Sequence, residues 1–302
     1  MRSLLLYLSR QKALRRWMET AAAARPLSSR FVAGIKLEDA MKAARSVNAQ
    51  NMSASLDYLG ENVTSLDQAL ACQAVYLKVL RDINSAGLNA NVSLKLTQFG
   101  IGISEGACRE NVRKVAVLAA QFRSFVRIDM EGSELTERTL EIVKDLHAET
   151  GACGAVIQAY LKRSLGDVEA LNGRRIRVRL CKGAYLEPPA VALADKHEVD
   201  ANFLVLARKL LAEGNYPGIA THDEKMISGT LEFVKERKIP AERFEFQMLY
   251  GVRRDLQKRL VAEGWRVRVY IPFGEAWYPY FMRRLAERPA NLLFVAKALV
   301  RG

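Results

Sequence analysis

Short apolar segments alternate with longer helical patterns along the chain from about residue 50 onward. Eight of the short segments combine β-branched and aromatic residues with a period near two, which predicts β-strands. The segments between them carry apolar residues at helical spacing, and several end in glycine, as helix C-termini do. The predicted strands cover residues 53–59, 91–99, 125–130, 154–160, 175–183, 218–222, 243–251 and 265–274.

Eight strand–helix repeats in about 250 residues predict an α/β fold, a (βα)8 barrel of the TIM type. A doubly wound sheet is the alternative, but no GxGxxG fingerprint follows the first predicted strand. No stretch rich in Pro, Gly and Ser interrupts the repeats. We therefore predict an N-terminal helical arm over residues 1–50 and a catalytic barrel over residues 51–302, with the final helix over the barrel mouth.

Composition narrows the classes of partner. The 302 residues are 50% hydrophobic, which is enough for a large core, and the net charge is +13. Nucleic acid, a membrane surface or an anionic ligand each suit a basic protein. The charge is spread along the chain and no zinc-finger or RNA-binding motif occurs, so we expect no nucleic acid. Four cysteines without CxxC and three histidines without HxH or HExxH predict no metal site.

The first 31 residues are basic and amphipathic. The apolar run from Leu4 to Leu8 is too short to span a membrane, and Arg10 and Lys12 follow too soon for a secretory signal. We expect a cytoplasmic protein with a helical arm, in peripheral contact with the inner membrane at most. The alternative is a transit peptide, which would place the protein in an organellar matrix.

Polar side chains fall near the ends of seven predicted strands. In a (βα)8 barrel the active site lies at the C-terminal ends of the strands. Alternation in the second strand puts Ser93, Lys95 and Thr97 on one face. Several fixed donors with few carboxylates predict a pocket for an anionic cofactor or substrate. The strand-end residues are Lys95, Asp129, Gln158, Arg179, Lys182, Thr221, His222, Gln247 and Tyr270.

Some of these residues have a second interpretation. Lys95 and Asp129 could form a structural salt bridge that explains both. His222 taken alone is more often a packing residue than a ligand. Lys95 or Lys182 could be a Schiff-base nucleophile, which would require a lowered pKa.

The stretch WYPYFMRRLAER, residues 277–288, predicts a helix with Pro279 in its first turn. Tyr280, Arg283, Arg284 and Glu287 are spaced by three and four residues, so they form one contiguous patch. Paired guanidinium groups match the planar oxygens of a carboxylate. An exposed helix with an ion pair worth about 0.3–0.5 kcal/mol is the alternative, and the aromatic neighbours argue against it.

Taken together, these motifs resemble the proline dehydrogenase family, the flavin-dependent (βα)8 enzymes of proline catabolism. The resemblance runs from about residue 30 to the C-terminus, and several motifs occur in order at strand ends. The motifs are SLKLTQFG, RIDMEGS, VIQAYLKR, RLCKGAY, FEFQMLYGVR, RVYIPFG and YPYFMRRLAERPAN.

The resemblance implies a role for each matching residue. Arg283, Arg284 and Lys95 would hold the proline carboxylate, and Glu287 would brace the last helix over the flavin. The walls around the proline ring would be Tyr270, Tyr280, Leu249 and Tyr185. The cradle of a non-covalent FAD would be Asp129, Gln158, Arg179, Lys182, Gly183, Thr221 and His222.

The resemblance also implies a reaction. A monofunctional, bacterial-type enzyme would oxidise L-proline to Δ1-pyrroline-5-carboxylate, with hydride transfer from proline C5 to the flavin. The electrons would pass to a membrane quinone. A Schiff-base lyase or aldolase on the same barrel is the alternative function.

Overall fold

Eight parallel strands close into a barrel in the order of the chain, from β1 back to β8. The computed structural model describes residues 30–287, with side chains as far as Met282. The closed barrel confirms the predicted TIM-type fold and excludes the doubly wound sheet. The strands are β1 (Ser53–Tyr58), β2 (Ala90–Leu94), β3 (Val126–Ile128), β4 (Cys153–Gln158), β5 (Arg177–Cys181), β6 (Gly218–Ala220), β7 (Glu245–Leu249) and β8 (Val267–Phe273).

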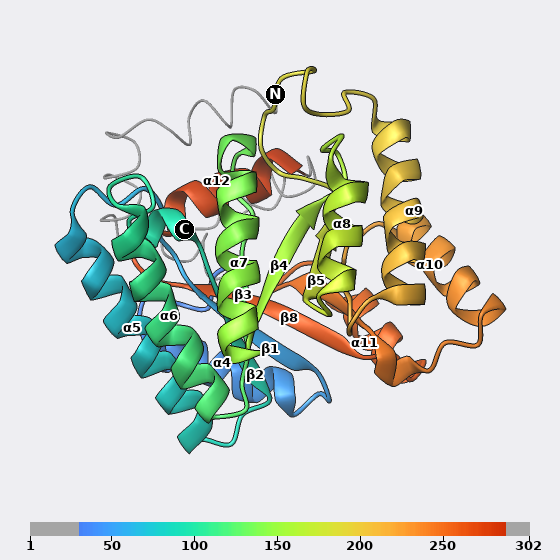
Figure 1. Cartoon of the computed structure of the whole chain (residues 1–302). Coiled ribbons are helices and arrows are strands. Elements are labelled where there is room, and N and C mark those ends of the chain that lie inside the picture. Colours follow the sequence, from blue (N-terminus) through green and yellow to red (C-terminus); the bar gives the residue numbers. More distant parts are fainter. Residues whose placement is uncertain (1–29, 288–302) are drawn as a thin grey trace, which may run out of the picture.

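Each strand is followed by a helix, and the helices surround the barrel (Figure 1). One further helix, α4, precedes the first strand of the described chain. The helices are α4 (Leu37–Asn48), α5 (Leu66–Ser85), α6 (Glu105–Gln121), α7 (Thr136–Thr150), α8 (Ser164–Gly173), α9 (Lys196–Glu213), α10 (Glu224–Glu236), α11 (Arg254–Ala262) and α12 (Trp277–Glu287).

Local signals set where several helices begin and end. The Ser65 side chain accepts a hydrogen bond from the Gln68 amide at the start of α5, and Asp223 caps α10 in the same way. Gly151 ends α7 in the left-handed conformation, with a φ of 66°. These capping residues fix where the loops between strands and helices begin and end.

The core lies between the strands and the helices. Outward-facing residues such as Leu56 and Val92 are fully buried beneath the helices. The inner face of the barrel is polar instead. Arg179 of β5 bonds Ser93 of β2 and Gln247 of β7, and strands so far apart in the barrel can meet only through its interior.

The second strand is shorter than predicted. It ends at Leu94, and residues Leu96–Phe99 form a 3-10 turn, η2, that ends at Gly100 with a φ of 87°. Ser93 and Lys95 still point into the barrel, but Thr97 turns away and bonds Glu131. The prediction that all three share one strand face is therefore wrong for Thr97, because the extended chain stops before it.

The other seven predicted strands overlap the observed ones, and most extend beyond them. The prediction for 243–251 begins at Arg243, the last residue of a 3-10 turn, Ala241–Arg243, and the strand starts at Glu245. The observed strands end where pairing with the neighbouring strand stops, and the local pattern of apolar residues does not record that point.

The described part of the predicted N-terminal arm contains α4, which packs against β1 and β8. Its buried residues include Ala40, Ala44 and Val47, and they belong to the same core as the barrel strands. Asn48 also exchanges hydrogen bonds with the backbone of Asn89. The rest of the predicted arm, residues 1–29, lies outside the described residues. The division of the chain at residue 50 stays a prediction.

The last helix, α12, lies at the end of the barrel toward which β4 points (Figure 1). Aromatic contacts hold its first turns. Trp277 packs on Phe281 with 5.7 Å between ring centroids, and Phe31 approaches Phe281 at 6.3 Å. The segment that precedes α4 and the final helix therefore meet at this end of the barrel.

Candidate active site

Polar side chains from six parts of the barrel converge at the carboxyl ends of the strands. They form one hydrogen-bonded group inside the barrel, which we call the mouth network. Its members are Asp57, Ser93, Lys95, Asp129, Arg179, Gln247 and Tyr270. The structure thus brings together residues that lie on separate strands.

Lys95 is the first residue after β2, and its side chain is mostly buried. Its Nζ donates to both carboxylate oxygens of Asp57, at 3.1 and 3.3 Å. It also lies 3.4 Å from an oxygen of Asp129 and 3.4 Å from the hydroxyl of Tyr270. The predicted pairing of Lys95 with Asp129 is confirmed, and Asp57 is a second, nearer partner.

Asp129 is the hub of the mouth network. It accepts hydrogen bonds from Ser93 at 2.7 Å, from Arg179 at 2.8 Å and from the hydroxyl of Tyr270 at 2.8 Å. Its own amide donates to the carbonyl of Leu94, which locks the chain just after β3 to the end of β2. One carboxylate therefore fixes donors from β2, β5 and β8 at once.

Arg179 spans the barrel interior. Its Nη1 donates to Ser93 as well as to Asp129, and its Nε donates to the side chain of Gln247. The guanidinium carbon lies 5.2 Å from the ring centroid of Tyr270, a cation–π contact. With these contacts Arg179 has little freedom to move, and its charge stays at the centre of the barrel.

Asp57 is the residue that sequence reasoning missed. It lies near the end of β1, is fully buried and binds Lys95. A signal was present, because Ser53, Ser55 and Asp57 alternate with Ala54 and Leu56. Aspartate is rare in β-strands. An aspartate at an inward-facing position of a regular alternation therefore indicates a polar barrel interior.

The two carboxylates of the mouth network, Asp57 and Asp129, differ in the direction of their pKa shifts. Burial raises the pKa of Asp57 above its ordinary value, although Lys95 opposes the shift. Burial also acts to raise the pKa of Asp129, but Lys95 and Arg179 outweigh it, so that pKa is lowered. Asp129 is therefore the firmly ionised carboxylate, and Asp57 is the one that protonates more easily.

Lys95 does not have the properties of a Schiff-base nucleophile. Burial acts to lower the pKa of its ammonium, but Asp57 and Asp129 outweigh burial and hold the pKa well above its ordinary value. A nucleophilic lysine needs the opposite shift. In this environment Lys95 is a permanent cation.

Lys182, the second lysine considered for that role, follows the end of β5. Its Nζ forms ion pairs with Asp223 at 2.7 Å and with Asp200. It therefore ties the loop after β5 to the start of α10 and to α9. Its ammonium is held between two carboxylates, which is a poor setting for nucleophilic attack.

Thr221 and His222 follow β6 and bond to neighbouring backbone. The Thr221 hydroxyl accepts from the amide of Asp223 at 3.1 Å. The Nε2 of His222 accepts from the amide of Leu249 at 2.9 Å, which links the end of β6 to the end of β7. His222 therefore links two strand ends, and its role toward a cofactor stays a prediction.

Gln158 and Gly183 shape the wall between β4 and β5. The Gln158 amide donates to the carbonyls of Met130 and Glu131, at 3.3 and 2.9 Å, and its buried Oε1 has no hydrogen-bond partner among the described residues. Gly183 has a φ of 127°, and a Cβ there would lie 2.3 Å from the ring of Tyr160. The wall thus combines an unused acceptor with a position that only glycine fits.

The remaining pocket residues lie at the same end of the barrel. Leu249 ends β7, Tyr185 lies in the loop after β5, and Tyr280 is buried in α12. Tyr185 contributes to the raised pKa of Lys95, so it lies near the network. The side chains of Arg283, Arg284 and Glu287 lie outside the described residues, and their roles stay predictions.

The fold and the site together define a (βα)8 barrel enzyme whose mouth carries fixed positive charges around two buried carboxylates. The sequence model of the proline dehydrogenase family matches residues 40–297. Proline dehydrogenase 1 of Bacillus subtilis (strain 168) is 41% identical over 301 residues, which cover 100% of this chain and 99% of that protein. The proline dehydrogenase of Deinococcus radiodurans is 42% identical over 91% of both chains.

The chain therefore belongs to the proline dehydrogenase family. It is an oxidoreductase that oxidises proline in proline catabolism. Membership in this family also supports the use of a flavin cofactor. The alternative of a Schiff-base lyase is not favoured by these comparisons or by the ion pairs of Lys95 and Lys182.

Solved structures support the fold. The crystal structure of proline utilization A from Bdellovibrio bacteriovorus, inactivated by N-propargylglycine, matches with a TM-score of 0.82 at 23% identity. The match covers 94% of this chain and 38% of that longer one. At this identity the likeness concerns the barrel and its helices.

No helix in the described range is both long and apolar enough to cross a bilayer. No group of three or more His, Cys, Asp or Glu side chains between residues 30 and 282 is arranged to hold a metal ion.

Proposed function

We propose that this chain oxidises L-proline to Δ1-pyrroline-5-carboxylate with a non-covalently bound FAD at the barrel mouth. The observation that carries the proposal is the mouth network, in which buried Asp57 and Asp129 hold Lys95 as a permanent cation. Family membership and this fixed positive charge support the proposal that the proline carboxylate binds beside Lys95.

The residues present fit a flavin. The unpartnered Oε1 of Gln158 is a buried acceptor that a ring N–H could satisfy, and Gly183 allows close approach at the neighbouring loop. Lys182 and Arg179 are cations at the same end of the barrel, each held in a fixed position by carboxylates. We propose that these residues hold the flavin, with Asp129, Thr221 and His222 completing the cradle and Glu287 bracing α12.

When bound, the flavin supplies the acceptor for the hydride that leaves proline. The chain itself supplies orientation and charge. We assign the substrate carboxylate to Lys95, Arg283 and Arg284, the last two from their spacing in the sequence. Tyr270, Tyr280, Leu249 and Tyr185 form the walls that exclude water from the ring.

We also propose that electrons leave the enzyme for a membrane quinone, with peripheral contact between a cytoplasmic enzyme and the membrane. The net charge of +13 supports this proposal, because basic proteins are attracted to anionic lipid surfaces.

An anaerobic absorbance experiment tests the function. The purified full-length protein should be yellow, and L-proline should bleach the flavin bands; a soluble quinone should then restore them. Pyrrolidine, which lacks the carboxylate, is the matched control and should bleach at least tenfold less effectively at equal concentration. A colourless protein that binds no added FAD would contradict the proposed cofactor. Equal bleaching by pyrrolidine would contradict the carboxylate assignment.

A further inference from the structure

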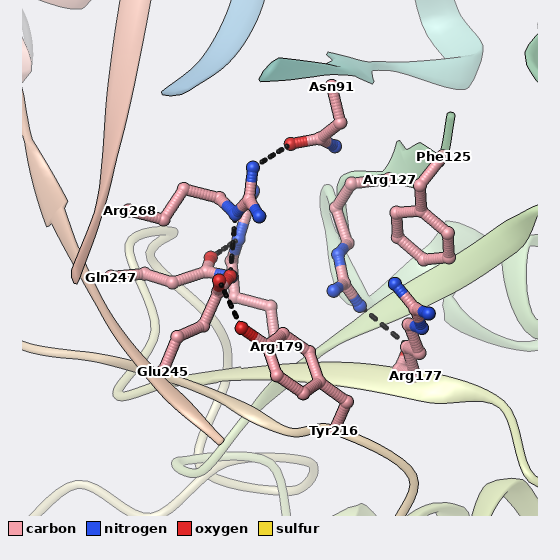
Figure 2. A pocket seen from close by; sticks show the side chains of 9 residues that line it. All are labelled: Asn91, Phe125, Arg127, Arg177, Arg179, Tyr216, Glu245, Gln247 and Arg268. Carbon is pink, nitrogen blue, oxygen red and sulfur yellow. Dashed lines mark hydrogen bonds and ion pairs between the residues drawn. The ribbon is translucent and has the colours of Figure 1, made fainter. Parts of the chain in front are cut away.

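A second polar region lies at the opposite end of the barrel, where the strands begin. It surrounds a cavity of about 30 Å³, which has room for one or two groups of the size of a water molecule (Figure 2). We call this region the floor. Its lining residues are Asn91, Phe125, Arg127, Arg177, Arg179, Tyr216, Glu245, Gln247 and Arg268.

The floor has four arginines and one carboxylate, and that carboxylate is already engaged. Glu245 accepts from Arg268 at 2.6 Å, from Gln247 at 2.6 Å and from the hydroxyl of Tyr216 at 3.2 Å. Arg179 pairs with Asp129 in the mouth network. Two positive charges, on Arg127 and Arg177, are left for the cavity.

Arg127 is a buried cation without an acidic partner among the described residues. It is 4% exposed, and its Nη1 donates only to the backbone carbonyls of Ala155 and Arg177, at 2.9 and 2.6 Å. Burial lowers the pKa of Arg127 far below the ordinary value, and repulsion from Arg179 adds to the shift, although attraction to Glu245 partly opposes it. A buried charge in this condition is costly unless an anion compensates it.

Arg177 stands beside Arg127 at the rim. Both guanidinium groups lie over the ring of Phe125, at 5.1 and 4.8 Å from its centroid, and Arg177 also lies over Tyr216 at 5.5 Å. Figure 2 shows the two guanidinium groups next to Phe125, with Glu245 and Arg268 on the other side of the cavity. Arg177 forms no salt bridge with any described residue.

The strands are built to accept this arrangement. Gly154 faces the floor from β4, and a Cβ there would lie 2.4 Å from the Phe125 ring and 2.9 Å from Nη1 of Arg127. A larger residue would displace both groups. The ring of Phe125 in turn holds the two arginines at one edge of the cavity, so their like charges are fixed close together.

We propose that the floor binds a small inorganic anion of about the size of chloride between Arg127 and Arg177. Guanidinium N–H groups are strong donors to anions, and two fixed cations at a partly enclosed cavity provide both charge and direction. The small cavity favours a monatomic anion or a compact oxyanion over an organic phosphate. The site lies at the end of the barrel opposite to the mouth network and does not depend on the function proposed for it.

Thermal unfolding of the flavin-loaded, full-length enzyme tests this site. Sodium chloride and sodium phosphate are each compared with sodium gluconate at constant ionic strength, so that general screening cancels. We expect chloride to raise Tm saturably, by on the order of 5 °C at about a hundred times its Kd. A rise with phosphate alone would also support the site and would identify its ligand as an oxyanion.

Two variants and one control make the result specific to the floor. Arg177→Gln, at the exposed rim, should fold normally and lose most of the anion-dependent rise, and Arg127→Met should abolish it. Arg237→Gln is the control, because Arg237 also stacks on an aromatic ring, Phe233 at 5.6 Å, outside the floor. Equal Tm in chloride, phosphate and gluconate would overturn the proposal, as would an anion-dependent rise that survives in both floor variants.

A bromide-soaked crystal gives a direct second readout. Anomalous density beside Arg127 and Arg177 is expected in the wild type, and its absence at the floor would contradict a halide site.

Discussion

At the mouth of the barrel two carboxylates face two cations, whereas at the floor one carboxylate faces three arginines. The mouth groups are Asp57, Asp129, Lys95 and Arg179. The floor groups are Glu245, Arg127, Arg177 and Arg268. The balanced charges at the mouth hold one another in place, whereas at the floor the positive charges exceed the negative ones.

The two ends are also connected. Arg268 and Gln247 bind Glu245, Gln247 binds Arg179, and Arg179 binds Asp129. A polar interior of this kind differs from the layers of branched apolar side chains usual in such barrels. Charge balance, rather than the type of residue, distinguishes the mouth from the floor, where positive charges exceed negative ones.

The largest effect is expected when the hub of the mouth network is removed. Asp129→Ala leaves Lys95 and Arg179 without their shared acceptor, and we expect the free energy of unfolding to fall by about 3–5 kcal/mol. Proline oxidation should fall about a hundredfold or more, since the cations move from their positions. Urea unfolding and steady-state kinetics measure the two changes.

Asp129→Asn is the matched control for this variant, because it keeps the shape and the hydrogen bonds at one carboxylate oxygen but removes the charge. It should lose less stability than Asp129→Ala. A loss below about 1 kcal/mol in the alanine variant, the size expected of a single neutral hydrogen bond, would show that Asp129 is not the hub.

A smaller effect is expected at the floor. Glu245→Gln removes the partner of Arg268, and we expect a loss of about 3 kcal/mol measured by urea unfolding in gluconate. The variant adds to the excess of positive charge, so chloride should raise its Tm more than that of the wild type. An equal or smaller chloride effect would contradict the contrast between the two ends.

The stability difference between the wild type and Glu245→Gln depends on pH. Burial acts to raise the pKa of Glu245, but Arg268 outweighs it, so the folded pKa is below the ordinary value of 4.5. The stability from this group is therefore present above about pH 4.5 and is lost as the pH falls through the folded pKa. The stability difference between wild type and Glu245→Gln should shrink below pH 4.5, as acid titrations of the unfolding free energy would show.

The smallest effect is expected from the removal of one hydroxyl at the mouth. Tyr270→Phe keeps the ring over Arg179 but loses the hydrogen bond to Asp129 and the contact with Lys95. We expect a loss of about 1.5–2 kcal/mol and a fall in proline oxidation of less than about tenfold. Activity as low as that of Asp129→Ala would mean that the hydroxyl, and not the carboxylate, organises the network.

Much of the site could be predicted because its residues mark strand ends. Lys95 and Asp129 both follow strands that are neighbours in the barrel, so their contact was an expectation that the structure confirms. Asp57 could not be assigned from the motifs, since its role depends on Lys95 leaving β2 and reaching back toward β1. The floor was missed entirely, because Arg127 and Arg177 look like ordinary alternating strand residues.

The sequence by itself determined the number of strand–helix units, the apolar outer face of the strands and the motifs that mark the family. These features are local, since the spacing of side chains along one segment decides which face is buried. Only the tertiary structure decided which polar residues meet. Asp57 and Tyr270 lie more than two hundred residues apart in the sequence, but both contact Lys95 because β1 pairs with β8. The register of that pairing cannot be read from any one segment.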